Sequence, residues 1–215
     1  MNYISIDTAR KNLEIIGEYD GAELYHIDES PLQHSVTLMP AIEKLMQTHN
    51  WDNIDCIGIN QGPGSFTGIR IGVTTVKVFS YLKNIKIIPF NSLEMYAYNI
   101  YSAYGDTIVC AMYSGNANVY IAVYENQNSL KQILEPKVLD KDEFSKFLEV
   151  IDEEVLIVCD FDLPFKKDNF KVSKIQKACK IGIKKIMQQA EERTSVGHNE
   201  LEPLYIQVPQ AQKNL

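Results

Sequence analysis

The stretch QGPGSFTGIRIGV, residues 61–73, contains four glycines and one proline, and it follows the apolar run IDCIGIN at residues 54–60. A continuous apolar run of this kind is typical of a strand buried on both faces of a sheet. The residues after the glycines predict a helix over about residues 67–82. A strand, a glycine turn and a helix in this order indicate an α/β fold with parallel strands.

The glycine segment itself is predicted to form a tight turn. Gly62 and Gly64 permit positive φ, and Pro63 fixes φ. Ser65 or Thr67 is expected to cap the helix that follows.

Two phosphate-binding motifs do not match this turn. A Walker loop needs a lysine directly after its last glycine, and Ile69 follows Gly68 instead. The dinucleotide motif G-x-G-x-x-G also fails, because the spacing from Gly64 to Gly68 is one residue too long. Anion binding by loop amides at the start of the helix stays open as an alternative.

The helix over residues 67–82 is apolar around more than half of its circumference. Its first face consists of Ile69, Val73, Val76 and Ser80. Its other side consists of Gly68, Ile71, Gly72, Thr75, Val78, Phe79 and Leu82. Since a surface helix needs only one apolar stripe, we expect a second body to cover this helix. The two glycines would let that body approach closely, so arginine at Gly72 is expected to spare the fold and abolish association.

A second helix is predicted over about residues 35–48. Leu38 and Ile42 lie on its apolar centre line, with Met39 and Met46 at one edge. The apolar arc is narrow enough for the chain's own core to absorb. Beside a helix with a surplus apolar face, the same residues also suit an interface, and both interpretations stay open.

The order of predicted elements repeats along the chain. Each half reads strand, strand, strand, helix, strand, helix, with the last helix expected over residues 174–193. This order predicts two related α/β subdomains with mixed sheets, over residues 1–104 and 105–215.

Composition narrows the classes of function. The 215 residues carry a net charge of -7, which argues against direct contact with nucleic acid. No signal peptide or membrane-spanning run is apparent, so a cytoplasmic protein is expected. The four cysteines, Cys56, Cys110, Cys159 and Cys179, are expected to be buried free thiols. The four histidines lack metal-binding spacing, and no metal is expected.

Four segments resemble one protein family. GINQGPGSFTGIRIGV (residues 58–73) resembles the signature of the TsaB, or YeaZ, family of the bacterial tRNA threonylcarbamoyladenosine system. YISIDTA (3–9) resembles the family's opening strand, and QHSVTLMPAIEKLM (33–46) resembles its His-Ser helix. LEPLYIQ (201–207) resembles its closing segment. The resemblance implies an actin/Hsp70/sugar-kinase (ASKHA, ribonuclease H-like) fold of two duplicated subdomains.

The resemblance also implies a role and partners. The chain is expected to be a non-catalytic partner of TsaD, which with TsaE and a TsaC-type enzyme modifies the adenosine beside the tRNA anticodon. Helices 35–48 and 67–82 would pair with TsaD, or with a second copy of the chain when TsaD is absent. Contact with tRNA would be indirect, and ATP or ADP would bind only in the complex. The expected interface residues are Leu38, Met39, Ile42, Met46, Gly68, Ile71, Gly72, Thr75 and Phe79.

The sequence departs from the family pattern at two places. Tyr113, Ser114 and Gly115 stand where the family has an Asp-Ala-Arg-like segment, and Gln207 stands where it has an arginine. These departures argue against a conserved polar role at these positions. They lie outside the helices predicted over residues 35–48 and 67–82.

The sequence supports a catalytic function less well than a non-catalytic partner role. Asp7 ends the first strand where a kinase of this fold would begin a phosphate loop, but the DTARKN segment has no glycine. Residues 107–124 contain no Asp or Glu to hold magnesium. A small kinase or ATPase remains the alternative. A glycoprotease-like peptidase is less favoured, because the chain has no H-E-x-x-H motif.

Overall fold

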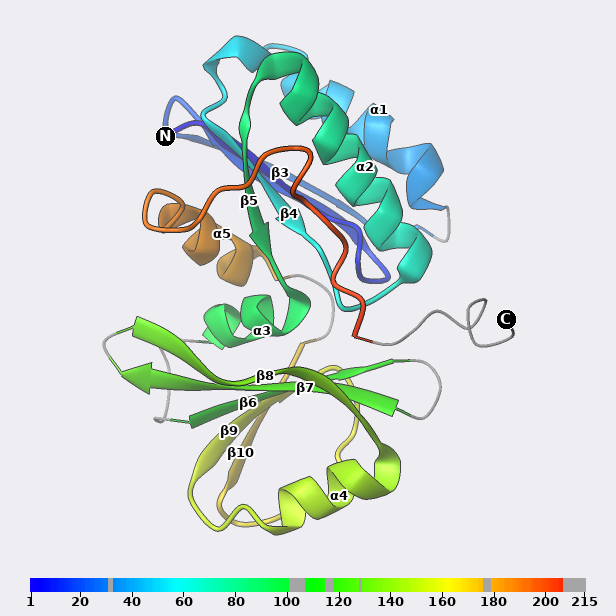
Figure 1. Ribbon diagram of the computed structural model, residues 1–215, viewed down its shortest axis with the longest axis vertical. Coiled ribbons are helices and arrows are strands. Elements are labelled where there is room, and N and C mark those ends of the chain that lie inside the picture. The colour runs from blue at the N-terminus through cyan, green and yellow to red at the C-terminus, as the bar shows by residue number, and fades with distance from the viewer. Residues whose placement is uncertain (31–32, 101–106, 115–117, 128, 176–178, 207–215) are drawn as a thin grey trace. The chain divides into compact units, whose positions relative to one another are not determined.

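The computed structural model describes residues 1–30, 33–100, 107–114, 118–127, 129–175 and 179–206. Its contacts divide the chain into two units (Figure 1). Unit 1 contains Met1–Ser92 and Ile183–Tyr205, and unit 2 contains Leu93–Gly182. Each unit has a mixed five-stranded sheet at its centre.

The sheet of unit 1 has the strand order β3-β2-β1-β4-β5. Its strands are β1 (Tyr3–Asp7), β2 (Leu13–Tyr19), β3 (Ala22–Asp28), β4 (Cys56–Asn60) and β5 (Lys86–Phe90). The hairpins β1-β2 and β2-β3 are antiparallel, whereas β1, β4 and β5 are parallel. Parallel pairing brings the carboxyl ends of β1 and β4 to the same edge of the sheet.

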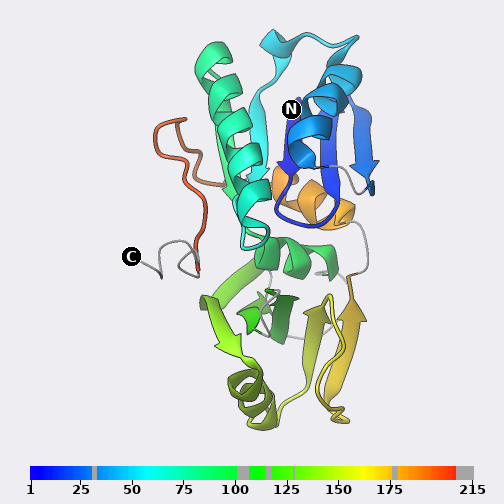
Figure 2. The same ribbon diagram turned by 90° about the vertical axis from the view of Figure 1, so that its right-hand side faces the viewer.

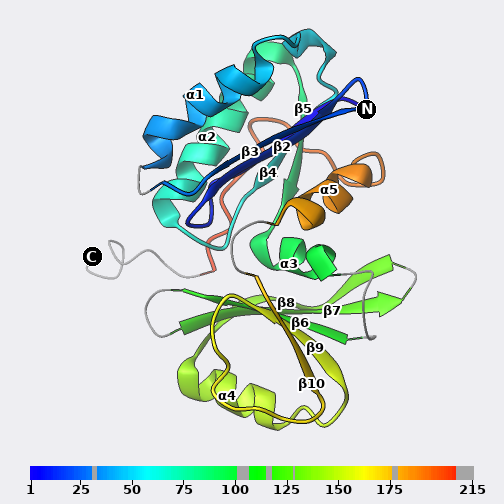
Figure 3. The ribbon, with the colours of Figure 1, turned by 180° about the vertical axis from the view of Figure 1, so that it is seen from behind.

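Helices cover both faces of this sheet. The helices α1 (His34–Met46) and α2 (Phe66–Lys83) lie on one face, as Figures 1 and 3 show from opposite sides. Alternate strand residues such as Ile57 and Ile59 point into that core, and both are fully buried. The opposite face packs against α5 (Lys180–Gln188). Gly58 of β4 lies so close to Met187 of α5 that a Cβ at this glycine would be 2.5 Å from Met187 Sδ.

The sheet of unit 2 repeats this topology in the order β8-β7-β6-β9-β10. Its strands are β6 (Thr107–Tyr113), β7 (Asn118–Gln127), β8 (Ser129–Asp140), β9 (Val155–Cys159) and β10 (Phe170–Lys174). The helix α3 (Ser92–Ile100) precedes β6, and α4 (Lys141–Glu149) connects β8 to β9. A capping box starts α4, in which Asp140 Oδ1 accepts from Glu143 N at 2.8 Å and Asp140 N donates to Glu143 Oε2 at 2.9 Å.

The predicted fold class, two duplicated α/β subdomains with mixed sheets, is confirmed. The predicted helix over residues 174–193 is too long, because α5 extends only over Lys180–Gln188, and the strand β10 has no counterpart among the predicted elements. Lys171, Val172 and Lys174 are exposed on β10, so this short strand has no apolar alternation to mark it. The contacts also assign residues 183–205 to unit 1, whereas the sequence places them in the second subdomain.

The four cysteines are free and buried, as the sequence predicts. Burial, together with the nearby Asp55 carboxylate, raises the pKa of Cys56 from its ordinary value of 9.0 to about 11. As the pH rises, this thiol therefore ionises at a lower pH in the unfolded chain than in the folded one. Its contribution to the free energy of unfolding is complete below pH 9 and is lost as the pH rises toward 11.

We expect this thiol to contribute about 1–2 kcal/mol to the alkaline loss of stability. Urea unfolding of the parent and of Cys56→Ala at pH 7.5 and 10.5 measures this contribution. The variant should lose less stability than the parent between the two pH values. Equal losses of stability in the parent and the variant would mean that ionisation of Cys56 does not cause the loss.

Among the described residues, every helix is too short or too polar to cross a bilayer.

Candidate partner-binding surface and the polar cluster at its base

The outer faces of α1 and α2 carry exposed apolar side chains. On α1, Val36 is 60% exposed and Met39 is 50% exposed. On α2, Val78 is 50% exposed and Leu82 is 67% exposed. The two helices lie side by side (Figure 2), so the exposed side chains occupy neighbouring elements of unit 1.

One stripe of α2 includes Val78 and Leu82. Ile71, Thr75, Val78 and Leu82 follow at spacings of four, three and four residues, which places them on one face of a helix. Ile71 and Thr75 are half-buried. We call the whole set the outer surface: Val36, Met39, Ile71, Thr75, Val78 and Leu82.

Three residues of the predicted interface lie in the core of unit 1 instead. Leu38, Ile42 and Met46 are only 1%, 2% and 5% exposed, and they belong to the buried cluster between the helices and the sheet. The apolar centre of α1 is thus covered by its own sheet, and Met39 is the one exposed residue among the four predicted interface residues on this helix. A helical projection identifies such an arc but does not tell which part of it the sheet covers.

The glycines of α2 also face inward. A Cβ at Gly68 would meet the carbonyl oxygen of Thr8, and a Cβ at Gly72 would meet Thr8 Oγ1 and lie 3.2 Å from Ile59 Cδ1. The expectation that these glycines admit a partner's backbone is therefore wrong, because they admit the end of the chain's own β1. The predicted interface set also includes Phe79, which stacks on Trp51 with the ring centroids 4.5 Å apart.

The glycine turn fixes the start of α2. Gly62 adopts a φ of 108° and precedes Pro63 through a cis peptide bond. Of the two candidate caps, Ser65 occupies the N-cap position, where its Oγ accepts from Gly68 N at 3.1 Å. Thr67 is exposed, and Gly64 approaches the carbonyl oxygen of Ala9 too closely for a side chain.

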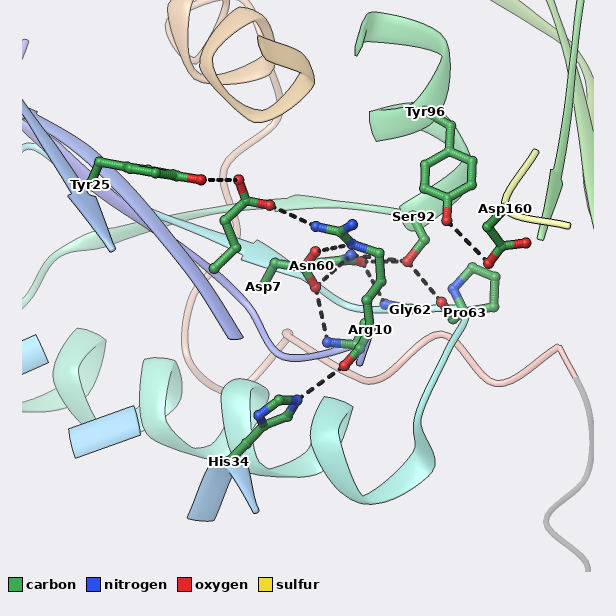
Figure 4. Close-up of polar contacts among 12 residues, drawn as sticks. Asp7, Arg10, Tyr25, His34, Asn60, Gly62, Pro63, Ser92, Tyr96 and Asp160 are labelled. Atoms are coloured by element: carbon green, nitrogen blue, oxygen red, sulfur yellow. Dashed lines mark hydrogen bonds and ion pairs between the residues drawn. The ribbon is translucent and has the colours of Figure 1, made fainter. Parts of the chain in front are cut away.

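A buried ion cluster lies where β1 ends (Figure 4). Arg10 Nε donates to Asp7 Oδ2 at 2.7 Å, and Arg10 Nη2 donates to Glu14 Oε2 at 2.6 Å. The side chains of Asp7 and Glu14 are fully buried, and that of Arg10 is 10% exposed. Burial, followed by the Glu14 carboxylate, raises the pKa of Tyr25 to about 12, and the Tyr25 hydroxyl donates to Glu14 Oε1 at 3.5 Å.

Asn60 connects this cluster to the glycine turn. Its Nδ2 donates to Asp7 Oδ1 at 3.0 Å and to Ser92 Oγ at 2.9 Å, and its Oδ1 accepts from Gly62 N at 3.0 Å. Ser92 Oγ in turn donates to the carbonyl oxygen of Pro63 at 2.7 Å. Asp7 and Asn60 meet because they end neighbouring parallel strands.

A magnesium phosphate group does not fit at Asp7. Both carboxylate oxygens already accept hydrogen bonds, Oδ1 from Ala9 N and Asn60 Nδ2 and Oδ2 from Arg10 Nε. The adjoining cation is a guanidinium, which would repel a metal ion. Within the described part of the chain, no group of three or more His, Cys, Asp or Glu side chains is arranged to hold a metal.

The closing segment of unit 1 packs along the other flank of α2. Leu201 is buried in the core, and Leu204 N donates to the carbonyl oxygen of Gln61 at 2.7 Å. Arg70 Nε donates to the Tyr205 hydroxyl at 2.9 Å, and the Arg70 guanidinium lies 3.8 Å from the centroid of Phe66. The segment thus binds both the turn and the first half of α2.

The departures from the family pattern lie partly within the structure. In unit 2, Asp160 accepts from the backbone nitrogen of Tyr113 at 3.0 Å. It also accepts from the Tyr96 hydroxyl at 3.4 Å (Figure 4). The contact at Tyr113 uses the backbone, so it does not depend on the side chain there. Gly115 and Gln207 lie outside the described residues.

Two mixed sheets of the same strand order, each packed against helices, define a duplicated α/β protein. Residues 29–194, more than half of the chain, match the family model described as TsaD, tRNA N6-adenosine threonylcarbamoyltransferase. The chain belongs to this family, in its TsaB or YeaZ branch.

Two curated relatives are described as tRNA threonylcarbamoyladenosine biosynthesis protein TsaB. The protein from Bacillus subtilis is 30% identical over 140 residues, which cover 63% of this chain and 60% of the relative. The protein from Escherichia coli is 25% identical over 132 residues, which cover 60% of this chain and 57% of the relative. The match therefore spans less than two thirds of the length of these relatives.

Solved structures share the fold over nearly the whole chain. YeaZ from Pseudomonas aeruginosa superimposes with a TM-score of 0.77 at 17% identity, over 95% of this chain and all of that chain. A second Pseudomonas aeruginosa structure, described as an uncharacterized protein with similarity to peptidase YeaZ, gives a TM-score of 0.79 at 17% identity, over 96% of this chain and 99% of that chain. At this identity the likeness shows the fold alone.

Proposed function

We propose that this chain is a non-catalytic partner of a TsaD-type transferase, and that it supports the transfer of threonylcarbamoyl to the adenosine beside the tRNA anticodon. The observation that carries the proposal is the outer surface on α1 and α2. Four of its apolar side chains are at least half exposed on two adjacent helices. Exposed apolar side chains on two adjacent helices favour a protein interface over a solvent-facing surface.

The family match supports the choice of partner. The model that matches this chain describes TsaD itself, so partner and chain would share a fold. Two chains of one fold can pair through equivalent helices, in the way that identical subunits form a two-fold interface. In the absence of TsaD, a second copy of the chain would occupy the same surface.

The polar cluster supports a non-catalytic role. A phosphoryl-transfer enzyme needs carboxylates free to hold magnesium. The Asp7 carboxylate instead binds Arg10, Asn60 and the backbone nitrogen of Ala9. Nucleotide is therefore proposed only for the complex with TsaD. The net charge of -7 favours tRNA contacts made by the other members of the complex, TsaE included.

A reconstituted reaction tests the proposal. Purified TsaD-type transferase, TsaE, a TsaC-type enzyme and tRNA are incubated with and without this chain, and modified adenosine is quantified by mass spectrometry. We expect modification only when the chain is present. Equal modification without it would refute the proposed role, and ATP turnover by the isolated chain would favour a small ATPase instead.

A further inference from the structure

Three consecutive residues after β1 each bind the start of one of the two outer helices. These residues are Thr8, Ala9 and Arg10, and we call them the anchor segment. All three and both helix starts belong to unit 1. The contacts are made by one hydroxyl and two backbone carbonyl oxygens.

Thr8 and Ala9 hold the first turn of α2. Thr8 Oγ1 donates to the carbonyl oxygen of Gly68 at 2.8 Å, and this bond is buried. The carbonyl oxygen of Ala9 accepts from the backbone nitrogen of Ser65, the N-cap residue, at 2.7 Å. Glycine at positions 64 and 68 leaves room for this approach, because a Cβ at either position would collide with the anchor segment.

Arg10 holds the first residue of α1. Its carbonyl oxygen lies 3.0 Å from Nε2 of His34, where that ring nitrogen donates (Figure 4). Gln33, at the N-cap position of this helix, makes no side-chain capping hydrogen bond. The contact with Arg10 is therefore a specific link from the start of α1 to the rest of unit 1.

The anchor segment is itself held rigidly. The Arg10 guanidinium spans two fully buried carboxylates, those of Asp7 and Glu14. Asp7 Oδ1 accepts from Ala9 N at 2.9 Å, so the carboxylate also fixes the segment's backbone. A segment bound at both its side chains and its backbone has few alternative conformations.

We propose that the anchor segment sets the positions of α1 and α2 relative to each other, and that Thr8 and His34 are thereby positioning residues for partner binding. Neither residue belongs to the outer surface. This inference rests on the proposed function, since it concerns the surface that TsaD would contact.

The physical reason lies in the rigidity that a two-helix interface requires. A partner that contacts both helices at once binds tightly only if their outer faces keep one arrangement before binding. When an anchor bond is removed, the helices sample several arrangements, and binding must restore one of them. The cost then appears in affinity more than in the stability of the isolated unit.

Conservative variants test this, because removing Arg10 would leave two buried carboxylates unpaired and risk unfolding. Thr8→Val removes the hydroxyl bond to Gly68 at nearly constant volume, Thr8→Ser retains the hydroxyl, and His34→Ala removes the link to α1. Tyr19→Phe is the matched control. It deletes a hydroxyl that accepts from Asn53 Nδ2 at 3.0 Å and from Asn50 N at 3.2 Å, at the other end of β2.

Two measurements are made on each variant. Spin labels at Val36→Cys and Val78→Cys report the distance between α1 and α2 in the isolated chain, and calorimetry reports its affinity for the TsaD-type transferase. Thr8→Val and His34→Ala should broaden the distance distribution and weaken binding about tenfold. Thr8→Ser and Tyr19→Phe should match the parent in both.

An unchanged distance distribution in Thr8→Val and His34→Ala would overturn the inference, whatever the affinity. Affinity losses equal to that of Tyr19→Phe would also overturn it. If the parent itself does not bind the transferase, the proposed function fails, and the distance measurement alone then decides whether the anchor positions the helices.

Discussion

Arginine in place of Val78 on α2 is expected to weaken binding to a TsaD-type transferase at least about a hundredfold. Val78 is 50% exposed in the isolated unit, and its stripe would lie at the centre of the interface. Binding would then bury a charge without a partner, which costs several kcal/mol. Because arginine favours helix more than valine does, the free energy of unfolding should change by no more than about 0.5 kcal/mol.

Calorimetry of the purified proteins measures the affinity, and urea unfolding measures the stability. Val172→Arg is the matched control, since Val172 is 47% exposed on the edge strand β10 of unit 2. The control should bind like the parent. Binding by Val78→Arg within twofold of the parent would exclude α2 from the interface.

Gly72→Arg is expected to unfold unit 1, with a loss of at least about 3 kcal/mol. A Cβ at Gly72 would collide with Thr8 Oγ1 and press on Ile59 at 3.2 Å, and both residues are fully buried. This reverses the sequence-based expectation that arginine at this position spares the fold.

Urea unfolding monitored by circular dichroism measures the effect. Thr74→Arg, at an exposed position on the same helix, should unfold at nearly the parent's urea concentration. A Gly72→Arg variant that unfolds like the parent and loses only its partner would show that the glycine faces outward.

Strand and helix periodicity predicts most of the architecture. Buried strands such as β4 and the long helix α2 have strong signals, and their observed bounds lie within two residues of the predicted ones. The strand β10 lacks such a signal because it lies at a sheet edge with exposed lysines. Helix starts show the same limit, since α1 begins at His34 with Gln33 at its N-cap position, and Gln33 makes no side-chain capping hydrogen bond.

Helix orientation is harder to predict than helix position. The surplus apolar surface of α2 is visible in the sequence, and the stripe through Val78 and Leu82 is exposed as a surplus face requires. The assignment of the glycines to that face fails because a glycine admits any close neighbour, and here the neighbour is Thr8.

The polar cluster is mostly hidden from sequence reasoning. Asp7 and Asn60 end parallel strands, and a register argument predicts that they meet. Arg10 and Glu14 have no such signal, because they come from a loop and an antiparallel strand whose pairing is known only from the structure. The anchor segment depends on backbone carbonyl oxygens, which residue types do not reveal.

The most direct test of the proposed interface is chemical protection of the outer surface. Because the four native cysteines are buried, a cysteine introduced at Val78 would be the main site for a maleimide reagent. Its labelling rate is measured with and without the TsaD-type transferase, at a concentration where the isolated chain is monomeric, and Val172→Cys serves as control. We predict that the transferase slows labelling at position 78 at least about tenfold and leaves position 172 unaffected. Unchanged labelling at position 78 in a complex that still forms would contradict docking through α1 and α2.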